Sequence, residues 1–119
     1  MPFLGDYQIY PTQIQSHTLR NIDGSSKYND KNWIQLYWQS LEEQGMSRPR
    51  GKKCWCCSEK AVLGSHVTFE HGKCWYIVPS CSRHNGQGFH AECQDDEVLV
   101  RVEPNMIKQL HANWSAFFG

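Results

Sequence analysis

The sequence has no long apolar run, no net charge and no internal repeat. Without a stretch of about 18 apolar residues, no membrane-spanning helix is expected. Residues 1–7 lack both a basic start and an apolar run of about 7–15 residues, so they do not resemble a secretory signal. We therefore expect an intracellular protein with no membrane partner, in which cysteines bind metal more often than they form disulfides.

The motifs of common enzyme classes are also missing. There is no Gly-rich phosphate-binding loop and no Gly-x-Ser-x-Gly nucleophile motif. The 119 residues have the length of one domain, which we assign to residues 1–119. A domain of this size buries only about 60–70% of its unfolded surface, so an additional staple such as a metal ion would stabilise it.

Charge is balanced overall but unevenly placed. Residues 45–91 contain seven basic and two acidic residues, whereas the segments on either side are acidic. Residues 45–53 form a basic linker made irregular by two Gly and one Pro. A basic segment is either an ordinary solvated surface or a nucleic-acid contact. The candidate contacts are Arg48, Arg50, Lys52, Lys53, Lys73 and Arg83, with Trp55 and Trp75 as residues that could stack on bases.

Apolar spacing predicts two helices. Residues 31–44 place Trp33, Leu36, Tyr37 and Leu41 on one face, and Gly45 is a suitable stop. Residues 105–117 carry a second apolar stripe after Pro104. Residues 1–30 are weakly patterned and are predicted to form an irregular arm, with one short strand near residues 7–10.

Three strands are expected in the second half of the chain. Residues 65–70 and 73–78 read as a β-hairpin, with its turn at His71-Gly72 and its end at Pro79. Residues 97–103 read as a strand in which Val98, Val100 and Val102 share one face and Leu99 takes the other.

The cysteines and histidines have the spacing of a structural zinc site. Cys54 and Cys57 form a Cys-x-x-Cys turn, and Cys81 and His84 follow after the predicted hairpin. Structural zinc takes four such ligands in a tetrahedron. The order of knuckle, hairpin and ligand pair is that of a treble-clef zinc finger. We therefore predict one zinc ion and an α+β fold, in which a zinc module over residues 54–93 is flanked by the N-terminal helix and the C-terminal strand and helix.

Other arrangements of the cysteines stay open at this point. Cys56 could replace Cys54 or Cys57 as a ligand. His90 and Cys93 repeat ligand spacing in reverse order, and could form a second zinc site. Its remaining ligands would come from Cys56, Cys74, His66 or His71. Three disulfides are disfavoured by the adjacent Cys56 and Cys57 and by the missing signal sequence.

Residues 54–88 resemble the zinc-containing HNH, or His-Me finger, endonucleases. Three stretches carry the resemblance: Cys54-x-x-Cys57, Gly64-Ser65-His66-Val67 and Tyr76-Ile77-Val78-Pro79-Ser80-Cys81-x-x-His84-Asn85. It implies a ββα fold, with His66 as the general base and Asn85 as a ligand of the catalytic metal. The sequence departs from the family where Ser65 replaces an acidic residue and where the hairpin lacks the Asn that orients the His.

Three functions remain after these departures. The first is a non-catalytic zinc module that recognises a protein or a nucleic acid. The second is a metal-dependent HNH-like nuclease using His66. The third is a structural or effector-like protein that zinc merely folds. A hydrolytic metal site needs more than the neutral Asn85 to hold a divalent ion, so the first is preferred.

Overall fold

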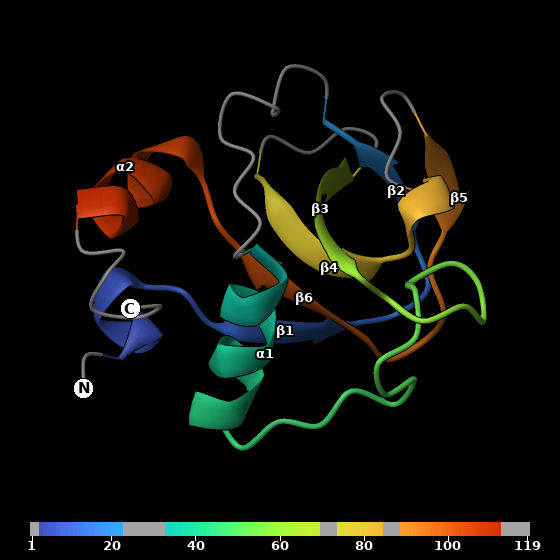
Figure 1. Ribbon diagram of the computed structural model, residues 1–119, viewed down its shortest axis with the longest axis horizontal. Helices are drawn as coiled ribbons and strands as arrows, with labels where there is room; N and C mark the ends of the chain where they lie inside the picture. The colour runs from blue at the N-terminus through green and yellow to red at the C-terminus, as the bar shows by residue number, and fades with distance from the viewer. Residues whose placement is uncertain (1–2, 23–32, 70–73, 85–88, 113–119) are drawn as a thin grey trace.

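The computed structural model describes residues 3–22, 33–69, 74–84 and 89–112 (Figure 1). Its centre is an antiparallel sheet with strand order β1-β6-β4-β3-β2-β5. The strands are β1 (Pro11–Ile14), β2 (Thr18–Asn21), β3 (Leu63–Phe69), β4 (Tyr76–Ser80), β5 (His90–Glu92) and β6 (Glu97–Arg101). The helices are the α-helices α1 (Trp33–Glu43) and α2 (Pro104–Ala112) and the 3-10 turns η1 (Leu4–Tyr7) and η3 (Ser82–His84).

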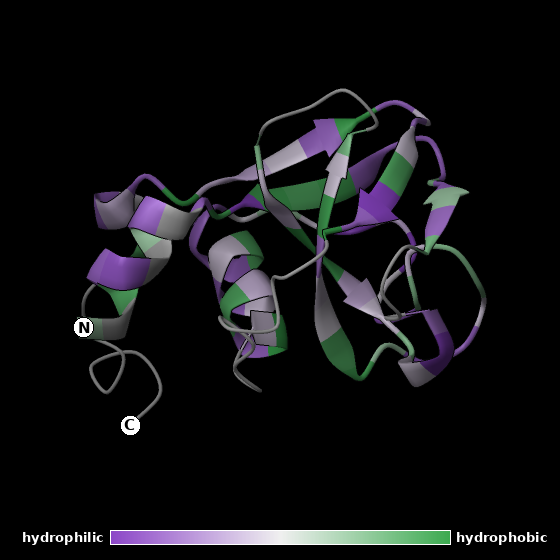
Figure 2. Cartoon of the chain, turned by 90° about the horizontal axis from the view of Figure 1, so that it is seen from above, coloured by the Kyte–Doolittle hydropathy of each residue, from purple (hydrophilic) through white to green (hydrophobic). Residues whose placement is uncertain are grey.

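Helix α1 lies on one face of the sheet and carries the larger core. The predicted apolar face of this helix is confirmed, because Trp33, Leu36, Tyr37 and Leu41 are all buried. They pack with η1, α2 and the helix-facing residues of β4 and β6, and we call this the helix-side core. In Figure 2 hydrophobic residues are seen along the strands and on the helices that supply this core.

The opposite face of the sheet carries a second core that contains cysteines, which we call the cysteine-side core. Its buried members are Leu19, Cys54, Trp55, Val67, Val78, Cys81, Cys93 and Leu99. Strand β6 supplies both cores by alternation: Val98 and Val100 face the helices, as does Val102 just beyond the strand, whereas Leu99 faces the cysteines. The predicted two-sided pattern of this strand is thus confirmed.

Gly64 lets α1 approach β3 closely. A Cβ atom built on Gly64 would lie 2.9 Å from the backbone N of Ile34 and 2.9 Å from the Cβ of Trp33. Real Cβ atoms essentially never come this close to such atoms. The first turn of the helix therefore rests directly on the strand backbone, and only glycine fits beneath it.

The prediction of an irregular N-terminal arm is wrong for residues 4–21, the part of it that the structure describes as η1, β1 and β2. Residues 4–7 form a 3-10 turn rather than part of a strand, and the chain enters β1 only at Pro11. Strand β1 pairs with β6, and β2 lies between β3 and β5. These pairings join residues about 50–90 positions apart, and a short strand with little alternation is ordered by such partners and not by its own pattern.

The antiparallel pairing of the two predicted hairpin strands is confirmed, but the strands begin and end at other residues than predicted. Strands β3 and β4 pair antiparallel, with Leu63 opposite Ser80 and Val67 opposite Tyr76. Pro79 lies inside β4 instead of ending it. The predicted turn at His71-Gly72 and the end of the helix predicted at 105–117 lie outside the described residues. No described helix is long and apolar enough to cross a membrane.

Candidate metal centre

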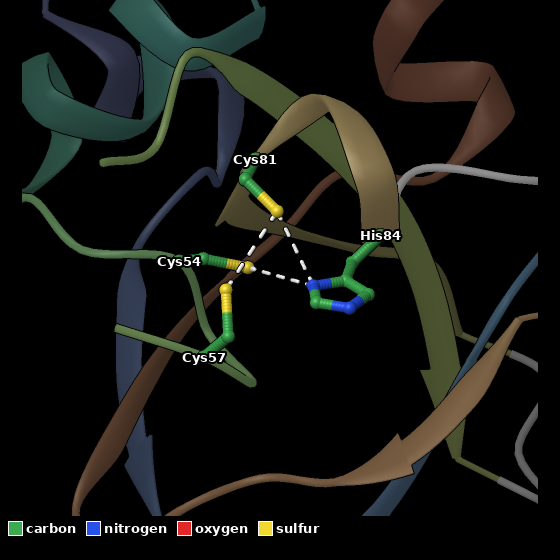
Figure 3. Close-up of side chains that lie close together, drawn as sticks. All are labelled: Cys54, Cys57, Cys81 and His84. Atoms are coloured by element: carbon green, nitrogen blue, oxygen red, sulfur yellow. Dashed lines mark hydrogen bonds between the residues drawn. The ribbon is translucent and has the colours of Figure 1, made fainter. Parts of the chain in front are cut away.

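Four side chains from two segments, residues 54–57 and 81–84, converge at one end of the cysteine-side core. Figure 3 shows the sulfur atoms of Cys54, Cys57 and Cys81 and one ring nitrogen of His84 pointing toward a common centre. These four donor atoms all lie within 4.8 Å of one another. The residues chosen from their spacing are therefore brought together as a group that can hold a metal ion.

The distances fit a tetrahedral ion. A zinc–sulfur bond of about 2.3 Å gives a sulfur–sulfur edge of about 3.8 Å in a regular tetrahedron. The Sγ atoms of Cys57 and Cys81 are 3.7 Å apart. The Nδ1 atom of His84 lies 3.2 Å from the Sγ of Cys81 and 3.9 Å from the Sγ of Cys54. Donor spacing and donor chemistry together fit one tetrahedral metal ion.

The knuckle, residues 53–60, is docked onto the end of β4. A bridge between Lys53 and Lys60 closes it, and the N–H of Cys54 donates to the carbonyl of Glu59 at 2.8 Å. The N–H of Trp55 donates to the carbonyl of Pro79 at 2.9 Å. Because Cys81 comes directly after β4, this docking sets the first ligand pair beside the second.

Hydrogen bonds favour the charged form of one ligand. Burial acts to raise the pKa of the Cys54 thiol, but backbone N–H groups of Cys56 and Cys81 donate to its sulfur and lower the pKa to about 6. Burial raises the pKa of the Cys81 thiol. Metal binding requires thiolates, and a bound metal ion would supply the positive charge that stabilises the thiolate of Cys81.

Aromatic rings cover the histidine ligand. The ring of His84 stacks on Phe89, with centroids 4.9 Å apart, and Trp55 meets the same Phe89 edge-on at 6.0 Å. Trp55 is fully buried. The suggestion that Trp55 stacks on bases is therefore wrong, because its ring is part of the core. Trp75 is half-buried against the helix-side core.

The basic linker does not form one exposed surface. Arg48 was a candidate nucleic-acid contact, but its side chain is only 1% exposed and forms an ion pair with Glu97. This expectation is wrong because Glu97, buried at the start of β6, needs a positive partner. Arg50 turns inward and donates to the carbonyls of Cys54 and Cys57.

The other four candidate nucleic-acid contacts differ in their surroundings. Lys52 and Lys53 are exposed, whereas Arg83 pairs with Glu59 and Lys73 lies outside the described residues. Sequence reasoning missed Lys60, which is exposed and stands opposite Lys53. The only signal for it was its position three residues after a ligand, where a knuckle closes back on itself.

The remaining cysteines and histidines do not form a second cluster among the described residues. Cys93 is buried in the cysteine-side core, and His90 is exposed on β5. Cys56 is different, because its Sγ lies 3.7 Å from the Sγ of Cys54. Burial and the neighbouring thiolates raise the pKa of Cys56 far above its usual range. Cys56 is not one of the four residues that converge, but it lies directly beside one of them.

His66 lies on the helix side of the sheet. The residue is 7% exposed, and its ring contacts Trp33 edge-on, with centroids 4.8 Å apart, and Trp75 at 6.0 Å. Burial lowers the pKa of His66 to about 4, so the imidazole is neutral near pH 7. Its Nε2 atom is buried without a hydrogen-bond partner. A general base must reach water, and this position does not provide that access.

The ββα arrangement is present only in part. The order of knuckle, paired strands and ligand pair is found, but the second ligand pair ends in the 3-10 turn η3, and no α-helix is found between η3 and β5 among the described residues. Strands β3 and β4 are also the central strands of the larger sheet and not a separate finger. Asn85 lies outside the described residues. No family model, curated protein or solved structure matches the chain.

Proposed function

We propose that this protein is a non-catalytic zinc-binding module whose ion fixes a surface loop for recognition of a partner. The observation that carries the proposal is the convergence of three thiols and one imidazole at tetrahedral spacing. This donor set is that of closed structural zinc sites, which leave no position for a reacting water. The burial of His66 gives a further reason to favour recognition over hydrolysis.

The exposed lysines of the knuckle favour a nucleic acid as the partner. Lys53 and Lys60 stand directly opposite each other, and like charges so placed repel. Among the described residues neither lysine forms an ion pair with an acidic side chain. Glu59, the neighbour of Lys60 in the sequence, pairs with Arg83 instead. A phosphate backbone would relieve this repulsion. Nearby, the Nζ of Lys52 lies 5.4 Å from the centroid of the half-buried Trp38 ring.

The zinc proposal is tested by native mass spectrometry of the purified protein. One zinc per chain is expected, and chelation should release the metal together with loss of structure in the knuckle. A metal-free protein with an unchanged circular dichroism spectrum would refute the proposal.

The partner proposal is tested by binding of single-stranded and duplex oligonucleotides at two salt concentrations. Phosphate contacts release counterions, so the log–log slope should be about −0.9 for each contact on a duplex. The Lys53→Ala/Lys60→Ala variant should lose this binding, whereas Lys108→Ala, an exposed lysine on α2, should keep it. Absence of binding at low salt, or binding that salt does not affect, would favour a protein partner.

A further inference from the structure

Two arginines from the basic segment make hydrogen bonds with the backbone of the knuckle. The Nε of Arg50 donates to the carbonyl of Cys54 at 3.1 Å, and its Nη2 donates to the carbonyl of Cys57. One guanidinium group thus spans the Cys-x-x-Cys turn and bonds to both of its ligand residues. A planar fork with several donors is suited to such bridging, whereas a lysine ammonium is not.

Arg48 extends these contacts to the sheet. Its Nη1 donates to the carbonyls of Gly51 and Lys53, where the chain enters the knuckle. Its Nε and Nη2 each donate to Glu97 at 2.8 Å. The carboxylate of Glu97 also accepts from the N–H of Val98 at 2.9 Å. Charged hydrogen bonds thus connect the backbone around the metal ligands with β6, and those between Arg48 and Glu97 are buried.

These contacts act on the two properties that a metal site needs. Hydrogen bonds to the carbonyls of Cys54 and Cys57 fix the turn that aims the two sulfur atoms. A zinc ion with three thiolates and a neutral imidazole carries one net negative charge, and the guanidinium of Arg50 lies next to it. Partners outside the ligand shell orient ligands and tune metal affinity in this way.

We propose that Arg50 and Arg48 are positioning residues of the metal centre: Arg50 sets the Cys54–Cys57 turn, and Arg48 links that turn to Glu97 of β6. The proposal rests on zinc binding by the four ligands. It assigns to the metal site two residues whose sequence context suggested nucleic-acid contact. It also makes the metal centre and the sheet one coupled unit, because Glu97 belongs to the sheet.

The first test uses Arg50→Ala and Arg50→Lys in the full chain. Zinc affinity is measured by competition with a chromophoric chelator, and ligand geometry by the absorption spectrum of the cobalt-substituted protein. Arg50→Ala should bind zinc about 10–100-fold more weakly, the range for loss of an outer-shell partner. Arg50→Lys keeps the charge but cannot bridge both carbonyls, so its affinity should lie between those of Arg50→Ala and the wild type.

The second test distinguishes an effect of Arg48 on zinc binding from an effect on folding. The variant Arg48→Met/Glu97→Leu replaces the buried ion pair with apolar side chains, which commonly preserves stability. It removes the bonds to Gly51 and Lys53, so zinc should bind more weakly while the sheet stays folded. Should this variant fail to fold, the two Arg50 variants decide alone, because they leave the buried pair intact.

Arg83→Ala is the matched control. Arg83 lies between the ligands Cys81 and His84, but its side chain is 69% exposed and pairs with Glu59 on the surface. Its loss should change zinc affinity by no more than about twofold. The proposed role of Arg50 would be overturned by wild-type zinc affinity and a wild-type cobalt spectrum in Arg50→Ala. Equal weakening of zinc binding in Arg83→Ala would overturn it as well. A wild-type protein that takes up no zinc would instead refute the proposed function.

Discussion

The cores on the two faces of the sheet differ in the residues that form them. On the helix side, 11 buried apolar residues from α1, α2, η1 and the sheet pack together without a metal. On the other side the buried core is smaller, and two of its members, Cys54 and Cys81, are candidate metal ligands. The helix side can form by burying apolar area alone, whereas on the cysteine side a metal ion bound by Cys54 and Cys81 would add its binding free energy to that burial.

This difference separates local from distant causes of stability. Leu36 and Tyr37 reach the helix-side core because they share a helix face, which neighbours in sequence determine. Cys54 and Cys81 meet only because the knuckle docks on β4. Damage to the first core should therefore cost stability in proportion to lost packing, and damage to the second should release metal.

The largest effect is expected from removal of a ligand. Cys81→Ser or His84→Ala opens the tetrahedron, and binding of structural zinc contributes on the order of 10 kcal/mol to the folding of small zinc domains. Each variant should lose zinc and lose structure in the knuckle, as measured by metal content and thermal unfolding. Cys74→Ser, outside the cluster, is the control. Equal zinc loss in the Cys74 and Cys81 variants would show that the ligand set is wrong.

A core substitution on the helix side should act on stability alone. Leu36 is fully buried, so Leu36→Ala leaves a cavity and should cost about 2–5 kcal/mol in urea unfolding. Zinc stoichiometry at low temperature should stay at one per chain. Gln35→Ala, on the exposed face of the same helix, should have almost no effect. Zinc loss in Leu36→Ala under folded conditions would mean that the two cores are a single unit.

His66 should give the helix side a pH dependence. Burial lowers its pKa from 6.5 to about 4, so the unfolded chain takes up a proton that the folded chain does not. Stability should therefore fall as the pH drops from about 6.5 to about 4, by up to about 3 kcal/mol for this one group.

The contribution of His66 is isolated by comparison with His66→Phe, since both proteins keep the same metal ligands. The unfolding free energy of the wild type should decrease more steeply with falling pH than that of the variant. Parallel pH profiles for the two proteins would show that the imidazole is not held neutral by burial.

The smallest effect is expected at Cys56. Cys56 is not one of the four ligands, so Cys56→Ser should change stability by about 0.5 kcal/mol or less and keep one zinc. Its sulfur lies 3.7 Å from that of Cys54, the spacing of two ligands. The double variant Cys54→Ser/Cys56→Ser should therefore lose zinc more completely than Cys54→Ser. Identical zinc affinity in these two variants would show that Cys56 cannot act as a substitute.

Local pattern made several features predictable. The spacing of Trp33, Leu36, Tyr37 and Leu41 gave the helix and its buried face, and alternation gave the two sides of β6. The four ligand residues could be chosen because structural metal sites use short, repeated ligand spacings. The strands at residues 11–14 and 18–21 could not be predicted, because their only distinguishing feature is the distant strands with which they pair.

The sequence by itself determined which donors are available and which segments are amphipathic, since both depend on residues a few positions apart. Only the tertiary structure decided what the basic residues do. Arg48 is buried because it pairs with Glu97, which lies 49 positions later in the sequence. Arg50 turns inward because two carbonyls of the knuckle accept its hydrogen bonds. A charge in the sequence has no fixed partner, and the folded chain decides whether it meets a carboxylate, a carbonyl or water.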